Sequence, residues 1–151
     1  MNKLKAFVAL DSDSNKKNLT IVRKLKNHVY GFKIGYRSFY RTDSIDLIRE
    51  IKKTSKLFLD LKLNDIPNTV LQGIESLEKI NPDYITLHIS GGLHMLKEAK
   101  KYIRQKKSKT KLLGVTLLTS LDQKDIKSMF GNITTKQVLK NYAKLADEAK
   151  I

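Results

Sequence analysis

The sequence of 151 residues contains no cysteine, no tryptophan and only two prolines. Without cysteine, the chain forms no disulfide, no thiolate zinc site and no cysteine nucleophile. It also lacks any apolar run near the roughly 18 residues that a membrane-spanning helix needs. The apolar segment from Ala6 to Leu10 is too short for the core of a signal peptide. We therefore expect a soluble, cytoplasmic protein.

Acidic residues are few: 15 Asp and Glu stand against 30 Lys and Arg, which gives a net charge of +15. Such a charge suggests nucleic-acid binding, but lysine supplies 25 of the basic residues and arginine, which base and phosphate recognition favours, only 5. The lysines are also spread along the chain, and Tyr102 is the only aromatic residue in their densest group, 97–111. The pattern favours a solvated, lysine-rich surface over a dedicated polyanion site.

Several catalytic motifs are missing as well. The chain has no Gly-x-Gly-x-x-Gly or Walker loop and no Gly-x-Ser-x-Gly nucleophile elbow. His88 and His94 lack metal-ligand spacing, and Gly91-Gly92 is a turn signal with modest capacity to cradle a phosphate. Any catalysis must therefore depend on fixed charges and a lysine proton donor.

What the chain does contain is an alternation of two kinds of segment. Short aliphatic and β-branched runs predict buried strands, and stretches with apolar residues three or four apart predict helices between them. The expected strands are Leu4–Leu10, Val29–Ile34, Lys56–Leu61, Asp83–His88 and Lys111–Leu117. Helix start signals are Asp13-Ser14, Asp43-Ser44, Asn68 and Thr134 or Thr135, the last opening a helix to Lys150 after a shorter one over Asp122–Met129.

The spacing of the expected strands indicates the fold class. Their starts, at 4, 29, 56, 83 and 111, are 25 to 28 residues apart. Strand–helix repeats of this kind indicate an α/β fold with parallel strands and right-handed crossovers. The regular period favours a (β/α)8 TIM barrel over a doubly wound sheet, with residues 1–151 as a single incomplete barrel domain of about five strands.

Charged residues lie where buried strands end. Asp11 follows the first strand, Lys33 lies in the second, Asp60 and Lys62 lie in the third, and His88 ends the fourth. In barrels and open α/β sheets, ligands bind at this end of the strands. A charge in a covered strand needs an explanation, because burial of an unpaired charge is costly.

The third strand predicts a charged network. Asp60 and Lys62 are two residues apart and share one face of the strand. Asp65 can return from the following loop and Lys33 lies one strand away, so we expect two lysines and two carboxylates to keep one another ionised. The alternatives are an ion-pair network that only fixes strand register, a turn or capping role for Asp11, and a hydrogen-bonded core position for His88. We expect Tyr36, Phe39 and Tyr40 to pack the second helix, without a functional role.

The same residues resemble a known family. Asp60-Leu61-Lys62-Leu63-Asn64-Asp65-Ile66-Pro67-Asn68-Thr69 is similar to the signature of orotidine 5'-phosphate decarboxylases, which make UMP. Four further blocks resemble the family and follow in its order: Val8–Asp11, Gly31–Gly35, Thr86–Gly92 and Gly114–Ser120. Related sugar-phosphate enzymes share Asp-x-Lys-x-x-Asp, and the following Ile-Pro-Asn-Thr makes the resemblance specific to the decarboxylases.

The resemblance implies a role for each charged residue. Lys62 would protonate C6 of the pyrimidine as carbon dioxide leaves, Asp60 would lie beside the substrate carboxylate, and Lys33 would orient Asp60 and contact the ribose. Asp11 would bind a ribose hydroxyl. The catalytic set implied is Lys33, Asp60, Lys62 and Asp65, and the substrate-binding set is Asp11, Lys33, Asp60, Leu61, Lys62, Leu63, Asn64, Asp65, Ile66, Pro67, Asn68, Thr69, Thr119 and Ser120.

The resemblance also implies partners and cofactors. Thr119, with or without Ser120, would contact the pyrimidine of orotidine 5'-phosphate and of UMP. Asp65 and Thr69 would reach the neighbouring site of a homodimer, and the family uses no metal or organic cofactor. Its carbanion is stabilised by the fixed charges of the protein.

The length completes these expectations. Eight units of this period need about 216 residues, so the 151 residues predict an N-terminal portion with about five units. The family binds phosphate through a later glycine–arginine pair and a glutamine-bearing loop, and we therefore expect the 151-residue chain to be a poor decarboxylase. The alternatives are a magnesium-dependent sugar-phosphate decarboxylase or aldolase of the same superfamily and a non-catalytic basic binding protein.

Overall fold

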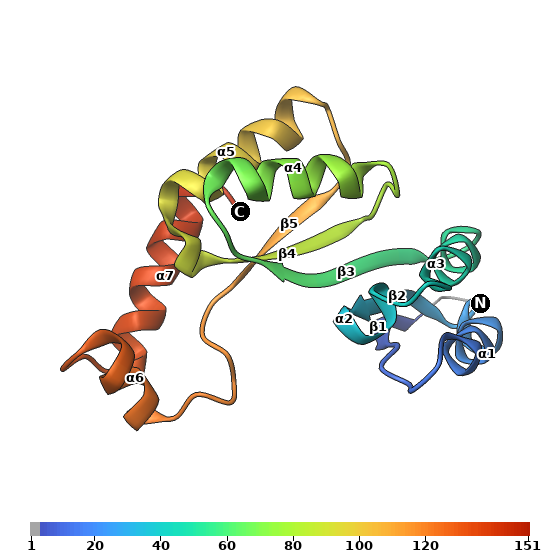
Figure 1. Cartoon of the computed structure of the whole chain (residues 1–151), viewed down its shortest axis with the longest axis horizontal. Helices are drawn as coiled ribbons and strands as arrows, with labels where there is room; N and C mark the ends of the chain where they lie inside the picture. The colour runs from blue at the N-terminus through green and yellow to red at the C-terminus, as the bar shows by residue number, and fades with distance from the viewer. Residues whose placement is uncertain (1–3) are drawn as a thin grey trace. The chain divides into compact units, whose positions relative to one another are not determined.

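Strands and helices alternate along the chain in a computed structural model that describes residues 4–151 (Figure 1). The strands are β1 (Leu4–Ala9), β2 (Val29–Gly35), β3 (Lys56–Leu63), β4 (Tyr84–His88) and β5 (Lys111–Val115). The helices are α1 (Asn15–Leu25), α2 (Tyr36–Phe39), α3 (Ser44–Lys52), α4 (Pro67–Glu78), α5 (Gly92–Gln105), α6 (Gln123–Phe130) and α7 (Thr135–Ala149), with a 3-10 turn, η1, over Ile89–Gly91. The predicted strand–helix order is confirmed.

The five strands form one sheet in the order β1-β2-β3-β4-β5. Neighbours in the sheet are consecutive in the sequence and run parallel, as right-handed crossovers through the intervening helices require. In the register of β2 and β3, Lys33 lies opposite Phe58 and Gly35 lies opposite Asp60. The expected α/β class with parallel strands is therefore confirmed.

The chain divides into two compact units, which we describe separately. The first unit contains the residues up to Leu61, Ser76–Ile85 and Lys109–Lys111, and the second contains Lys62–Glu75, Thr86–Ser108 and Leu112–Ile151. Strand β3 passes from the first unit to the second between Leu61 and Lys62. A single domain over residues 1–151 stays a prediction.

The first unit is built around β2 and β3. Phe32 and Ile34 on β2 and Leu57 and Leu59 on β3 are fully buried, and helices α1 and α3 add Val22, Leu47 and Ile51. At the start of the strands, the ring of Phe7 meets the rings of Tyr30, Phe58 and Tyr84 edge-on, with centroids 5.3–5.4 Å apart. This apolar base leaves the charged residues of β2 and β3 at the opposite end of the strands.

The second unit is built around α4, α5 and α7. Helix α5 buries Met95, Leu96, Ala99 and Ile103, the last three of which are three or four residues apart, and α7 buries Val138, Tyr142 and Ala149. An exposed ion pair between Lys97 Nζ and Glu148 Oε1, 2.7 Å apart, joins α5 and α7 at the surface. The predicted helical periodicities thus correspond to packed faces.

Two of the predicted helix start signals are confirmed together with their capping hydrogen bonds. Ser14 accepts a hydrogen bond from the Lys17 N–H at the start of α1, and Thr134 forms a capping box with Gln137 at the start of α7.

The Asp43-Ser44 signal also precedes a helix as predicted: α3 begins at Ser44 and Asp43 holds its N-cap position, although the Asp43 carboxylate accepts a hydrogen bond from the Asn15 amide and none from the helix. The predicted start at Asn68 is wrong in detail. Helix α4 begins at Pro67 rather than after Asn68, since proline suits the first helical position, where its missing N–H needs no partner. Among residues 4–151, no helix combines the length and apolarity that crossing a membrane requires.

Candidate active site

In the first unit, an ion pair joins neighbouring strands at their carboxyl ends. Lys33 Nζ on β2 lies 3.0 Å from Asp60 Oδ2 on β3. The two side chains retain 26% and 13% of their exposure, so most of their hydration is lost and each charge depends on the other. Both follow apolar residues that anchor the strand, which places the pair at the edge of the core.

Asp11 lies beside this pair in the loop that follows β1. Its carboxylate is exposed, and its Oδ1 lies 3.8 Å from the position that a Cβ on Gly35 would take. The guanidinium of Arg37 donates to the main-chain oxygen of Asp11 over 3.2 Å. The first unit therefore gathers Asp11, Lys33 and Asp60 at one end of β1, β2 and β3.

Tyr36 is a further polar residue at this end of the strands that the sequence pattern did not predict. We expected Tyr36 and Tyr40 to pack a helix, but both are exposed, and their rings stack with centroids 5.6 Å apart. The Tyr36 hydroxyl donates to the main-chain oxygen of Leu61, between Asp60 and the Lys62 position. Partial burial raises the pKa of this hydroxyl, with smaller contributions from Tyr40 and the Asp60 carboxylate, so it stays a donor. The position of Tyr36 directly after β2, where other strands also end in polar residues, could have indicated a place in the site.

In the second unit, Lys62 has an unusual backbone conformation. Its φ of 45° lies in the left-handed region, which residues with a Cβ seldom adopt. The Lys62 N–H donates to Oγ1 of the buried Thr86 over 2.8 Å, which holds this conformation in place. Strain retained at a lysine in this way is typical of functional sites.

His88 ends β4 in the same unit. Burial lowers the pKa of its imidazole, and the positive charge of Lys62 lowers it further. Both effects disfavour the charged form, so His88 is neutral at pH 7. The electrostatic contact with Lys62 connects it to the candidate site.

The rest of the signature follows Lys62. Leu63 ends β3, Asn64, Asp65 and Ile66 are exposed in the loop, and Pro67, Asn68 and Thr69 form the first turn of α4. Asp65 Oδ1 accepts the Ile66 N–H over 2.7 Å, which shapes the loop. The carboxylate of Asp65 is therefore accessible to solvent.

A cavity of about 530 Å³ lies in the second unit beside this loop. Its polar lining comes from Asn64, His88, Ser90 and Thr116, and apolar residues of α6 and α7 close it. Thr119 and Ser120 are exposed in the loop after β5 and are not among its lining residues.

Of the predicted network of four charges, the contact between Lys33 and Asp60 is observed, and the inclusion of Lys62 and Asp65 stays a prediction. Lys33 and Asp60 are in contact in the first unit, while Lys62 and Asp65 belong to the second. Within residues 4–151, no group of three or more His, Cys, Asp or Glu side chains is arranged to hold a metal ion. The chemistry available from these residues is that of preorganised charge and of lysine ammonium groups.

Comparison with known proteins finds relatives along the whole chain. The orotidine 5'-phosphate decarboxylase of Malacoplasma penetrans is 39% identical over 153 residues, which cover 100% of this chain and 66% of that protein. The enzyme of the same name from Fusobacterium nucleatum is 38% identical and is covered over 63% of its length. The chain thus spans slightly less than two thirds of these relatives.

Solved structures give the same result for the fold. The crystal structure of orotidine 5'-phosphate decarboxylase from Lactobacillus acidophilus matches 96% of this chain and 67% of its own, at a TM-score of 0.83 and 33% identity. That of the Methanocaldococcus jannaschii enzyme, complexed with the inhibitor BMP, matches at a TM-score of 0.79 and 24% identity, which supports the fold alone. The profile of the Orotidine 5'-phosphate decarboxylase / HUMPS family matches residues 5–151, and the chain belongs to this family.

Proposed function

We propose that this chain carries the charged half of an orotidine 5'-phosphate decarboxylase site, which releases carbon dioxide from orotidine 5'-phosphate and leaves UMP. The observation that supports this most is the Lys33–Asp60 ion pair at the end of β2 and β3, followed directly by Lys62 and the Asn64–Thr69 segment. Decarboxylases of this name at 38–39% identity add support.

In the proposed reaction, the bond between C6 of the pyrimidine and the carboxylate carbon breaks. Its electron pair stays on C6, and the Lys62 ammonium supplies the proton that forms the new C6–H bond. Asp60 lies beside the departing carboxylate, where its fixed negative charge favours the loss of charge at that position. Lys33 keeps Asp60 ionised and oriented, and no metal or organic cofactor takes part.

The remaining residues bind substrate in this proposal. Asp11 accepts a hydrogen bond from a ribose hydroxyl, and Thr119 or Ser120 contacts the pyrimidine. Asp65 and Thr69 reach the site of a second copy in a homodimer. The exposure of Asp65, Thr69, Thr119 and Ser120 is compatible with contacts outside this chain's own core.

We further propose that these 151 residues alone turn over slowly. In this chemistry, contacts to the remote phosphate supply binding energy that is realised in the transition state. The glycine–arginine pair that the resemblance implies for the phosphate does not occur among the 151 residues. We therefore expect a low kcat as well as a high KM.

The experiment measures the rate at which the purified chain forms UMP from orotidine 5'-phosphate, with and without a chelator. A decarboxylase of the proposed kind is insensitive to the chelator and loses activity in Lys62→Ala. A magnesium-dependent sugar-phosphate decarboxylase or aldolase of the same superfamily would instead act on a sugar phosphate and stop when the metal is removed. Chelator-sensitive activity of that kind would contradict the proposal.

A further inference from the structure

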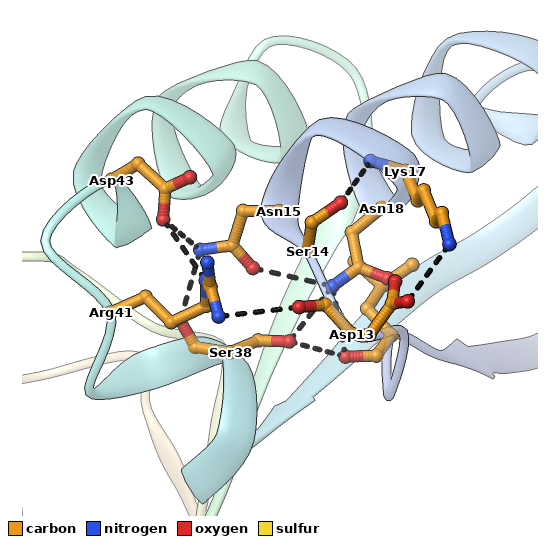
Figure 2. A network of polar contacts seen from close by, with 9 residues as sticks. Asp13, Ser14, Asn15, Lys17, Asn18, Ser38, Arg41 and Asp43 are labelled. Carbon is orange, nitrogen blue, oxygen red and sulfur yellow. Dashed lines mark hydrogen bonds and ion pairs between the residues drawn. The ribbon is translucent and has the colours of Figure 1, made fainter.

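Three polar side chains are fully buried beside the end of β1. Asn15 and Asn18 on α1 and Ser38 on α2 each have an exposed fraction of 0%. Burial of an amide or hydroxyl group costs free energy unless it is hydrogen-bonded. Figure 2 shows these three side chains in one network, and no buried side-chain nitrogen or oxygen in residues 4–151 lacks a partner.

The amide of Asn18 holds the main chain on both sides of Asp11. Its Nδ2 donates to the oxygen of Leu10 over 3.3 Å, and its Oδ1 accepts the N–H of Ser12, also over 3.3 Å. An amide side chain can do both, since it carries a donor and an acceptor. The peptide groups before and after Asp11 are thus fixed by one side chain.

Ser38 and the sheet add further bonds to Leu10. The Ser38 hydroxyl donates to the Leu10 oxygen, and the Leu10 N–H donates to the Lys33 oxygen over 2.9 Å. The Asn18 amide also donates to Ser38 Oγ over 2.8 Å. The residue before Asp11 is therefore fixed to both α1 and α2 and to the strand that carries Lys33.

Asn15 ties this cluster to the start of α3. Its Nδ2 donates to the Ser38 oxygen over 3.1 Å and to Asp43 Oδ1 over 2.7 Å (Figure 2). A network of this kind contributes little net stability compared with apolar residues of the same shape. What it adds is a single fixed geometry for the groups it joins.

The loop so fixed presents the Asp11 carboxylate toward the candidate site. Gly35 lies opposite Asp60 in the register, and the Asp11 carboxylate approaches the open side of Gly35. The carboxylate is exposed while its main chain is anchored. A rigid, solvent-facing carboxylate next to an ion pair is suited to accept a hydrogen bond from a ligand hydroxyl group.

We propose that Asn18 is a positioning residue that fixes Asp11 to accept a hydrogen bond from a hydroxyl of a nucleotide ribose, and that it thereby contributes to selectivity for ribonucleotides. The ribose assignment rests on the function proposed above. Because a hydrogen bond to a charged group is strong, a nucleotide that lacks the ribose hydroxyls should bind about tenfold more weakly.

The first test needs no ligand. Backbone 15N relaxation of Asp11 and Ser12 is compared among the wild-type chain, Asn18→Leu, which keeps the number and branching of the side-chain heavy atoms but makes none of the hydrogen bonds, and Thr110→Val. Thr110 is the matched control, because it is buried in the same unit and its hydroxyl donates to the Pro82 oxygen over 2.7 Å. We expect Asp11 and Ser12 to lose order only in Asn18→Leu. Unchanged order in that variant would overturn the positioning role.

The second test measures dissociation constants for UMP and for 2',3'-dideoxyuridine 5'-monophosphate by NMR titration. We expect the wild type and Thr110→Val to prefer UMP by about tenfold, and Asn18→Leu and Asp11→Asn to lose that preference. A wild-type preference retained in Asn18→Leu would overturn this inference. Failure of the wild type to bind UMP would instead contradict the proposed function.

Discussion

At the scale of single residues, Lys62 combines a functional side chain with a strained backbone. At a φ of 45°, the Cβ of Lys62 lies close to its own carbonyl group, which costs free energy. The hydrogen bond from the Lys62 N–H to Thr86 holds the backbone in this conformation. The proposed proton donor is therefore set at an angle that a regular strand would not give it.

This strain predicts an unusual ranking of substitutions. Lys62→Gly should be about 1 kcal/mol more stable than Lys62→Ala, because glycine adopts positive φ without steric cost. At Lys140, in the middle of α7, the order should reverse, since glycine is poor inside a helix. Urea unfolding of the four variants measures both differences. Equal stability of Lys62→Gly and Lys62→Ala would show that the backbone at this position is relaxed.

The pKa of His88 makes a prediction about pH. Burial and the charge of Lys62 lower the pKa in the folded chain below that of the unfolded chain. Below about pH 6.5 the unfolded chain therefore binds the extra proton more readily, and the free energy of unfolding falls as the pH drops toward the folded pKa. Above pH 6.5 this contribution is constant.

The check compares wild type with His88→Gln, whose side chain does not titrate. Urea unfolding between pH 7 and pH 5 should show a smaller loss of stability for His88→Gln. At and above pH 7, the free energy of unfolding should change with pH equally in the two proteins. Parallel curves for the two proteins would contradict the lowered pKa.

At the scale of elements, the close approach of β2 to β3 is made possible by Gly31. A Cβ on Gly31 would lie 2.4 Å from the main-chain oxygen of Lys56 and 2.5 Å from the Phe7 ring. Gly73, within α4, has no atom within 4 Å of its added Cβ. The two glycines therefore form a matched pair.

We expect Gly31→Ala to lower the free energy of unfolding by about 3 kcal/mol, because backbone must move to admit the methyl group. Gly73→Ala should raise it by about 0.5–1 kcal/mol through better helix propensity. Denaturant unfolding gives both values. A Gly31→Ala variant as stable as wild type would contradict the packing of β2 on β3 described above.

The elements were largely predictable from the sequence, and the exceptions have physical causes. Apolar runs and helical spacing placed every strand within two residues of its observed ends, since burial determines both. Helix α2 escaped prediction because four residues hold no periodicity. The roles of Asn18 and Ser38 were not predicted either, because a polar residue in a helical pattern usually faces solvent. Only the fold shows that the side chains of these two residues donate to the Leu10 oxygen.

At the scale of the molecule, the charged residues divide between two compact units. Asp11, Lys33 and Asp60 belong to one, and Lys62, Asp65 and the loop after β5 belong to the other. Strand spacing and the residue types at strand ends could be read from the sequence alone, as could the family signature. The anchoring of Asp11 and the bond from Tyr36 to Leu61 required the three-dimensional structure, because they join residues far apart in the chain.

The most direct test of the central claim is the rate of UMP formation from orotidine 5'-phosphate by the purified 151-residue chain, with Lys62→Ala and Lys136→Ala measured alongside. We predict a slow but measurable rate that neither a chelator nor replacement of the exposed Lys136 changes. In Lys62→Ala, we predict that the rate falls to zero. A rate that Lys62→Ala leaves unchanged would contradict the account.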